Sequence, residues 1–159
     1  MTTAAVRALL DSVHDPEIPV LTISDLGILR DVEVAGTHVV VTISPTYSGC
    51  PAMDEIRADI DAVLAEGGFD GEVRTVLSPA WTTDWMTDAG RRKLLEYGIA
   101  PPRPTRSGPV AVELGRTVIG CPQCASRDVE ELSRFGSTSC KSMWRCNSCR
   151  EPFDHFRAH

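Results

Sequence analysis

The chain has 159 residues, of which 42% are hydrophobic and 24% charged, and its formal net charge at pH 7 is −6. This length can hold one ordinary domain and one smaller module stabilised by metal. The charge is uneven, because residues 1–100 carry 16 acidic and 7 basic side chains whereas residues 101–159 carry 6 and 9. An acidic main body disfavours nucleic acid as the main partner and favours protein partners.

The sequence also argues against a membrane partner. No apolar stretch approaches the thickness of a bilayer, and no cationic and apolar leader opens the sequence. The six cysteines suit a reducing compartment in which thiols stay free. We therefore expect a cytoplasmic protein.

The first half of the chain alternates between helical and strand periodicity. Apolar residues at helical spacing predict a short amphipathic helix over 2–13, which ends before Pro16 because the residue preceding a proline disfavours helix. Runs rich in Val and Ile at 28–34 and 38–44 predict a β-hairpin. A second helix is predicted over 51–66, where the apolar side chains share one face.

A third strand and a third helix complete this domain. Residues 71–78 have strand character, and Thr87 or Asp88 can cap a last helix that ends before Gly98. The order α-β-β-α-β-α predicts an α+β domain in which helices cover one face of a small mixed sheet.

Proline marks a boundary after this domain. Four prolines between residues 100 and 109 predict a stiff, extended linker. We therefore divide the chain into an α+β domain over 1–99, a linker over 100–116 and a cysteine-rich module over 117–159.

The cysteine-rich module contains two CxxC pairs, Cys121 with Cys124 and Cys146 with Cys149. Two thiolates separated by two residues lie on one tight turn, so two such turns can complete a tetrahedral four-sulfur site suited to Zn(II). We expect a closed structural zinc site, on a ribbon-like hairpin with strands at 129–135 and 141–145. The alternatives are iron in the same site, which thiolate softness also permits, and a redox-active dithiol.

Three other residues of the module are weaker metal-ligand candidates. Cys140 is interpreted as a buried hairpin residue, with an alternative metal ligand or a second transfer thiol as the other interpretations. His155 and His159 could replace a thiolate, but four well-spaced cysteines already complete the site.

Cys50 is the candidate functional thiol of the first domain. Pro51 suits the first helical position, which places Cys50 at or next to the N-cap of the second helix. Unpaired backbone N–H groups and the positive helix end favour a thiolate there and make Cys50 a better metal ligand. Gly49 permits a sharp turn, and Ser44 and Thr46 supply nearby hydroxyls. The alternative is a small buried residue at a strand-to-helix junction.

Several short motifs follow one another along the first hundred residues, and their order indicates a family resemblance. They are Asp15-Pro16-Glu17, Asp25-Leu26-Gly27, the β-hairpin, Gly49-Cys50-Pro51 and the run from Trp81 to Met86. In this order they resemble the iron–sulfur cluster assembly factor family that includes SufT. With the cysteine-rich tail and the run 45–52, the chain resembles over essentially its whole length the PaaD family, accessory subunits of the multicomponent phenylacetyl-CoA epoxidase.

The resemblance implies a role in iron–sulfur maturation in which Cys50 is the reactive or metal-touching thiol. Asp15, Glu17 and Asp25 would be neighbours that line the same site. From the residues alone, Asp15 and Asp25 are more simply turn and cap residues. Trp81 is expected to pack over the sheet edge, with an exposed protein-contact surface as the alternative.

The function implied is that of an accessory or maturation subunit of phenylacetyl-CoA 1,2-epoxidase in aerobic phenylacetate degradation. Its cargo would be transient iron or an iron–sulfur cluster, and its main partner the iron–sulfur reductase subunit. No phosphate loop, dinucleotide motif, Ser-His-Asp order or diiron motif occurs, so catalysis would lie on other subunits.

One alternative function is that of a structural bridge between oxygenase and reductase. Another is nucleic-acid binding through the dispersed cations of the tail, which are Arg127, Arg134, Lys141, Arg145 and Arg150.

Overall fold

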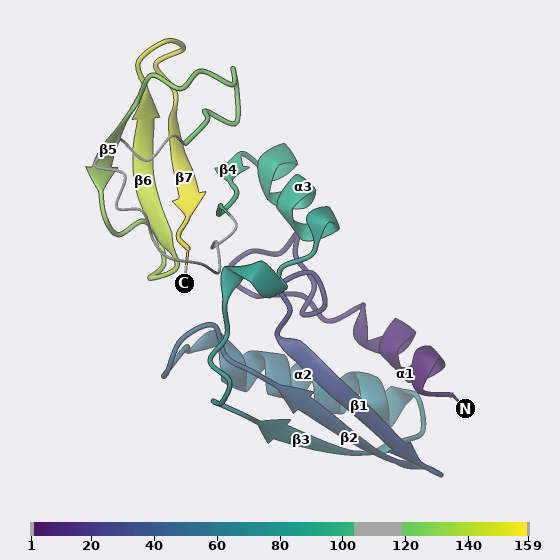
Figure 1. Cartoon of the computed structure of the whole chain (residues 1–159). Helices are drawn as coiled ribbons and strands as arrows, with labels where there is room; N and C mark the ends of the chain where they lie inside the picture. The colour runs from purple at the N-terminus through teal and green to yellow at the C-terminus, as the bar shows by residue number, and fades with distance from the viewer. Residues whose placement is uncertain (1, 104–118, 159) are drawn as a thin grey trace. The chain divides into compact units, whose positions relative to one another are not determined.

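The computed structural model describes residues 2–103 and 119–158. The chain divides into two compact units, Met1–Gly90 and Arg91–His159, each with a sheet of its own (Figure 1). The boundary predicted from the prolines falls later, after residue 99. Residues 104–116 of the predicted linker and the first two residues of the predicted module lie outside the described residues, so the domain limits stay a prediction.

A three-stranded mixed sheet forms the base of the first unit. Its order is β1-β2-β3, with β1 at Leu29–Ala35, β2 at His38–Ile43 and β3 at Asp70–Thr75. β1 and β2 are the antiparallel strands of the predicted hairpin, and β3 pairs with β2 in parallel. Val39 and Val41 of the central strand are fully buried and point to the same face, because alternate side chains share a face.

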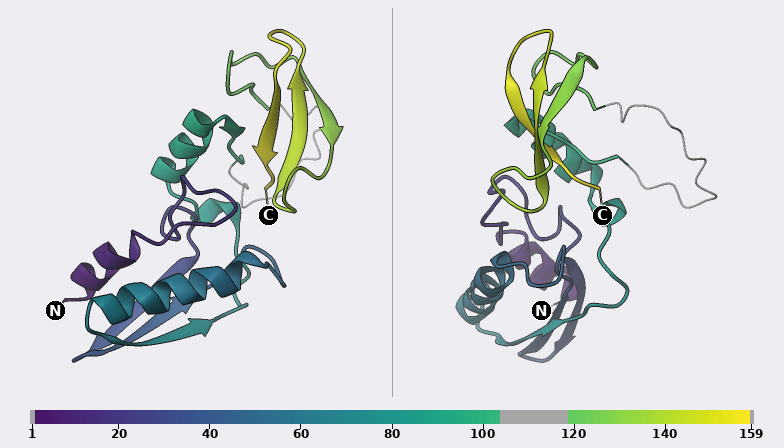
Figure 2. Two further views of the ribbon diagram at one scale, coloured as in Figure 1. Left: turned by 180° about the vertical axis from the view of Figure 1, so that it is seen from behind. Right: turned by 90° about the vertical axis from the view of Figure 1, so that its left-hand side faces the viewer.

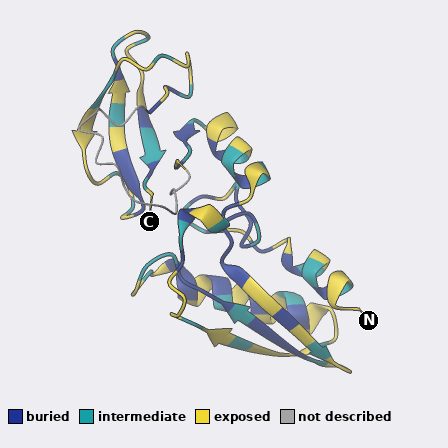
Figure 3. Ribbon diagram, in the orientation of Figure 1, coloured by how far each residue is buried: buried dark blue, intermediate teal, exposed yellow. Residues whose placement is uncertain are grey.

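Two helices cover one face of this sheet. α1 (Thr3–Leu10) and α2 (Ala52–Glu66) pack against each other, and α2 lies along the strands (Figure 2). α2 has a buried face and an exposed face, and Ile56, Ile60 and Leu64 of the predicted apolar stripe are inaccessible to solvent (Figure 3). The predicted α+β class with helices on one face of a mixed sheet is confirmed.

Trp81 joins two loops of the first unit. Its side chain is 5% exposed, and its Nε1–H donates to the carbonyl of Leu26 at 2.9 Å. Next to this bond, Gly27 has a φ of +72°, and a Cβ there would lie 2.5 Å from the carbonyl oxygen of Trp85. The guanidinium of Arg30 stacks 3.5 Å from the centre of the Trp85 ring. Trp81 is therefore a buried core residue, as expected from the sequence, and not part of an exposed contact surface.

The second unit contains a four-stranded sheet in the order β4-β7-β6-β5. β5 (Val129–Ser133) and β6 (Lys141–Cys146) form the predicted hairpin. β7 (Pro152–Phe156) and the two-residue β4 (Ile99–Ala100) add strands that the sequence did not predict. β4 pairs in parallel with β7, so the start of the predicted linker is part of this sheet.

The predicted third helix is α3 (Asp88–Tyr97). Its first turn is capped as expected, because the Thr87 hydroxyl accepts the N–H of Gly90 at 2.9 Å. The boundary between the two compact units falls within this helix, whereas the sequence-based division placed all of it in the first domain. Within the described ranges, no helix is both long enough and apolar enough to span a bilayer.

Candidate functional site

The two CxxC pairs lie on two matching turns, which we call knuckles (residues 121–126 and 146–151). In the first knuckle the carbonyl of Cys121 accepts the N–H of Ala125 at 2.9 Å, and in the second the carbonyl of Cys146 accepts the N–H of Arg150 at 3.0 Å. Ala125 and Arg150 both have a positive φ, 59° and 69°, which is uncommon for residues with a side chain. The two knuckles therefore have the same type of backbone turn. The CxxC pattern alone does not specify this turn.

The four sulfurs form one cluster with the dimensions of a zinc site. All Sγ atoms of Cys121, Cys124, Cys146 and Cys149 lie within 4.8 Å of one another. The Sγ atoms of Cys121 and Cys149 are 3.7 Å apart, and those of Cys124 and Cys146 are 3.5 Å apart. A tetrahedron with Zn–S bonds of about 2.3 Å has edges of about 3.8 Å. The donor set and its spacing thus fit Zn(II), and four protein ligands leave no open position for a substrate.

Backbone amides lower the pKa of one of these thiols. The N–H of Cys149, 3.5 Å away, and then the N–H of Ser148 lower the pKa of Cys146 to about 6, against the opposing effect of burial. The Glu151 N–H lowers the pKa of Cys149, but burial and the neighbouring thiols outweigh it and raise that pKa to about 12. The backbone amides therefore favour the thiolate form of Cys146, and a bound divalent cation would stabilise thiolates at all four positions.

The other candidate ligands of the module lie outside this cluster. The four-sulfur group does not include Cys140, which is buried and has its Sγ 3.0 Å from the hydroxyl of Thr138. His155 is half-buried on β7, where burial first and then Arg103 and Arg157 lower its pKa to about 4. Its Nδ1 lies 3.4 Å from the hydroxyl of Ser142. His159 lies outside the described residues.

Cys50 occupies a tight turn directly before α2. The N–H of Cys50 donates to the carbonyl of Tyr47 at 3.3 Å, and Gly49 between them has a φ of +80°. Pro51 is the N-cap, so Cys50 lies next to the cap, as predicted, and its carbonyl accepts the N–H of Met53 at 3.2 Å. The thiol is partly exposed. This position combines solvent access with the N-terminal end of a 15-residue helix.

A small cavity of about 100 Å³ adjoins this turn. It is lined by Ser44, Pro45, Thr46, Tyr47, Ser48, Leu77, Ala80 and Trp81. Ser44 is 1% exposed, and its hydroxyl has no hydrogen-bond partner among the described residues. A buried hydroxyl without a partner is costly and suggests a place for water or a ligand group. Ser44 was expected from the sequence only as a hydroxyl near Cys50, and no sequence pattern indicates that Leu77 and Ala80 line this cavity.

The acidic candidates make hydrogen bonds typical of turns and caps. Asp15 is buried, and its Oδ1 accepts the N–H groups of Glu17 and Ile18, both at 2.8 Å. Asp25 is also buried, and its carboxylate accepts the N–H of Thr22 at 3.1 Å and the hydroxyl of Thr87 at 3.2 Å. Neither aspartate is among the described residues that line the small cavity beside Cys50.

Two family models match separate parts of the chain. The model described as "Iron-sulfur cluster assembly protein" matches residues 3–77, which contain Cys50. The model described as "PaaD zinc beta ribbon domain" matches residues 105–157, which contain the four-cysteine cluster. The chain thus combines an iron–sulfur assembly domain with a zinc ribbon.

Solved structures resemble the first part of the chain. A domain of unknown function (DUF59) from Bacillus anthracis is 29% identical, with a TM-score of 0.55, and the match covers 58% of this chain and 90% of that one. A conserved hypothetical protein from Thermotoga maritima is 27% identical, with a TM-score of 0.50, over 59% and 94% of the two chains.

Two relatives connect the fold with named proteins. The "Fe-S protein maturation auxiliary factor" of Porphyromonas gingivalis (strain ATCC BAA-308 / W83) is 34% identical over 57% of this chain and 85% of its own length. The Escherichia coli (strain K12) protein named as a subunit of a "Putative 1,2-phenylacetyl-CoA epoxidase" is 48% identical over 94% of this chain and 89% of its own. With this similarity across both units, and with a ribbon that matches the PaaD model, the chain belongs to the PaaD family.

Proposed function

We propose that the protein is an accessory, maturation subunit of the phenylacetyl-CoA epoxidase system, and that it handles iron or iron–sulfur clusters for that system through Cys50. The name of the Escherichia coli relative supports the first part of this proposal. The match to an iron–sulfur cluster assembly model over residues 3–77, and the name of the Porphyromonas gingivalis relative, support the second. Thiol chemistry of this kind requires a reducing compartment, so we place the function in the cytoplasm.

The observation that carries the proposal is the position of Cys50. Cys50 is partly exposed directly before α2, and the adjoining cavity is lined in part by Ser44, whose buried hydroxyl has no hydrogen-bond partner among the described residues. The cargo would move by ligand exchange. The Cys50 thiol loses its proton to solvent and forms an S–Fe bond as an earlier ligand leaves, and a thiolate of the client later replaces it. No electron is transferred in this sequence, so no oxidant or reductant is needed.

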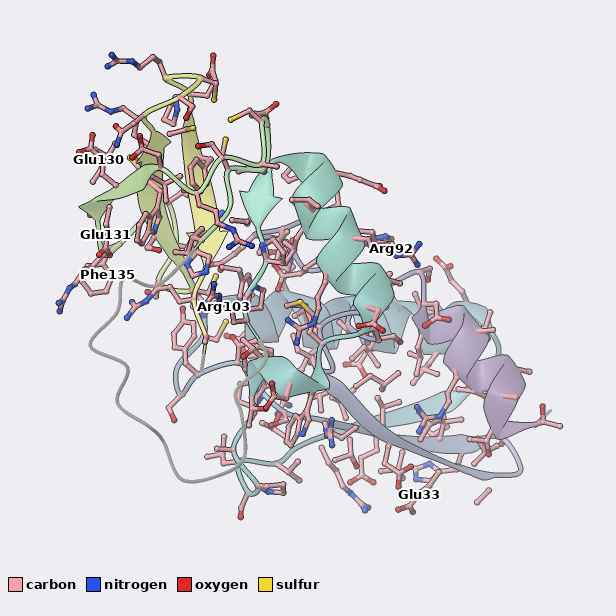
Figure 4. The ribbon with its side chains drawn as sticks, turned by 45° about the horizontal axis from the view of Figure 1, so that its top comes forward. Glu33, Arg92, Arg103, Glu130, Glu131 and Phe135 are labelled. Atoms are coloured by element: carbon pink, nitrogen blue, oxygen red, sulfur yellow. The ribbon has the colours of Figure 1, made fainter. Side chains whose placement is uncertain are left out.

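The ribbon would serve as the docking module. Its metal-stabilised sheet exposes Leu132, Phe135 and Met143, with 49%, 65% and 41% of their surfaces accessible. Figure 4 shows Phe135, with Glu130 and Glu131, on the β5 side of the ribbon. Exposed large apolar side chains beside charged ones are typical of protein contact surfaces. We propose the iron–sulfur reductase subunit as the client, because it is the component that needs cluster delivery.

The test measures cluster loading of the client in cells. Cells that lack the native copy are supplied with the wild-type protein, with Cys50→Ala or with Cys140→Ala, and the reductase is purified without air. Cys50→Ala should lower the iron and sulfide content of the reductase several-fold, whereas Cys140→Ala should leave it unchanged. Full cluster loading and full epoxidase activity with Cys50→Ala would refute the role of Cys50.

A structural bridge between oxygenase and reductase is the second candidate, and the exposed apolar residues of the ribbon favour it. A bridge needs these contacts and not the thiol of Cys50. Under this alternative, a stoichiometric complex with unchanged turnover survives Cys50→Ala, whereas Phe135→Ser disrupts it. Both functions predict that the complex survives Cys50→Ala, so epoxidase turnover of that complex distinguishes them: it is unchanged for a bridge and lowered for a maturation subunit.

A further inference from the structure

The second unit contains a cavity that the proposed function does not use. Its volume is about 350 Å³, which lies within the usual range for small-molecule sites. It is lined by Leu95, Ala100, Pro101, Arg103, Ile119, Gly120, Cys121, Ala125, Arg127 and His155. These residues lie on α3, on β4 and the segment directly after it, on β7, and on the first knuckle and the residues that flank it. Because Cys121 is among them, the cavity lies beside the four-cysteine cluster.

The polar part of this cavity is cationic. Arg103 and Arg127 are among its lining residues, and no aspartate or glutamate is found among the described residues that line it. Figure 4 shows Arg103 on the segment that follows β4. Guanidinium groups stay charged at all physiological pH values, and their planar forks match a carboxylate with paired hydrogen bonds. Two of them on one cavity therefore favour an anionic ligand.

His155 adds an imidazole to the same cavity. The Nε1–H of Trp144 donates to the hydroxyl of Ser142 at 2.9 Å, and this hydroxyl can in turn donate its own proton to the Nδ1 of His155, 3.4 Å away. When Nδ1 accepts, the proton of a neutral imidazole is on Nε2. His155 can thus offer an N–H group to an acceptor atom of a ligand.

The remaining lining is apolar. Leu95, Ala100, Pro101 and Ile119 contribute aliphatic surface, and Ala100 and Ile119 also belong to the core of the unit. A fixed apolar wall on a well-packed core suits a hydrophobic group of defined size. The cavity therefore combines space for a short apolar group with donors for a negatively charged head.

We propose that this cavity binds a carboxylate carried on a short apolar group, with the carboxylate at Arg103 and Arg127. The ligand is either a free small organic acid or the carboxyl-terminal residue of a partner protein, since both offer the same chemistry. This site goes beyond the proposed function, because it involves neither Cys50 nor a metal ligand exchange.

The experiment is a titration of the isotope-labelled, zinc-loaded full chain followed by NMR. Four probes are used in two matched pairs: phenylacetate and its uncharged amide, and a short peptide ending in phenylalanine with a free or an amidated carboxyl end. A free carboxylate should produce saturable shifts at Gly120, Ala125 and His155 with a Kd below about 1 mM. The matched amide should bind at least about tenfold more weakly, because it lacks the charge. The acid that binds with the lower Kd identifies the source of the ligand, either a free small organic acid or a protein carboxyl end.

Variants connect the binding to the cavity. Arg127→Gln and Arg103→Gln should each weaken the binding of the acid about tenfold, whereas Arg134→Gln, on the ribbon but outside this lining, should leave it unchanged. Unchanged zinc content and amide spectra show that each variant is folded. Equal binding of acid and amide, the absence of saturable shifts with both acids, or wild-type binding by both cavity variants would overturn the proposal.

Discussion

The indole of Trp81 connects two loops of the first unit through its buried hydrogen bond to the carbonyl of Leu26. Trp81→Phe keeps much of the apolar contact but removes the donor from this carbonyl. We expect the free energy of unfolding to fall by about 1–3 kcal/mol, the usual cost of leaving a buried polar group without its partner. Urea denaturation measures this loss. Trp85→Phe is the matched control, because it keeps an aromatic ring for Arg30, and equal losses in the two variants would contradict the assignment.

His155 should titrate far below an ordinary histidine, since burial first and nearby arginines second lower its pKa to about 4. The unfolded value is about 6.5, so between these two pH values the unfolded chain binds more protons than the folded one. The stability of the second unit therefore falls as the pH drops through this window. NMR titration of the imidazole should give a midpoint near 4. A midpoint near 6.5 in the folded, zinc-loaded protein would show that the side chain is solvated.

Among single residues, spacing identified the four cysteines that cluster but not the backbone turns that hold them. The CxxC pairs were predictable because two sulfurs on one turn are a local pattern. The positive φ of Ala125 and Arg150 was not, since neither residue type signals it. The cavity at Ser44 could not be predicted either, because part of its lining comes from Leu77, Ala80 and Trp81, more than thirty positions away in the sequence.

Among the elements, the turn into β1 depends on Gly27. Its φ is positive, and a Cβ on this residue would lie only 2.5 Å from the Trp85 backbone, so there is no room for a methyl group. Gly27→Ala should destabilise the first unit by more than about 2 kcal/mol, since backbone strain of about 1 kcal/mol adds to a clash with backbone atoms. Thermal unfolding monitored by circular dichroism measures the effect.

Gly36 is the control for this substitution. It also has a positive φ, +66°, but no atom lies within 4 Å of the position of its Cβ. Gly36→Ala should therefore cost only the strain, about 1 kcal/mol. If the two alanine variants unfold at the same temperature, the close approach at Gly27 is not what stabilises this turn.

The elements differ in how far local sequence determines them. α2 and the hairpin of β1 and β2 were predicted almost to their ends, because each has a clear periodicity and a recognisable end signal. β4 has two residues and stands next to prolines, so only its pairing with β7 makes it a strand. β7 begins at a proline and has five residues, which is too short for a strong periodic signal.

In the molecule as a whole, the two units should respond differently to loss of metal. The core of the second unit is small and includes the metal-ligand candidates Cys121 and Cys146 with Ile119 and Phe153. Small domains of this kind depend on their metal for folding. A chelator should remove the amide protection of β5, β6 and β7 and leave that of β1 to β3, as measured by hydrogen exchange. Retained protection in the ribbon after complete metal removal would contradict a structural metal site.

We propose a division of labour between the two units, in which the four-cysteine cluster holds structural zinc and Cys50 handles iron. Metal and sulfide analysis of the wild type and of Cys50→Ala, both purified without air, is the sharpest test of this division. We expect one tightly bound zinc per chain in both proteins and additional, labile iron only in the wild type. Equal iron content in the two proteins, or loss of zinc on Cys50→Ala, would contradict it.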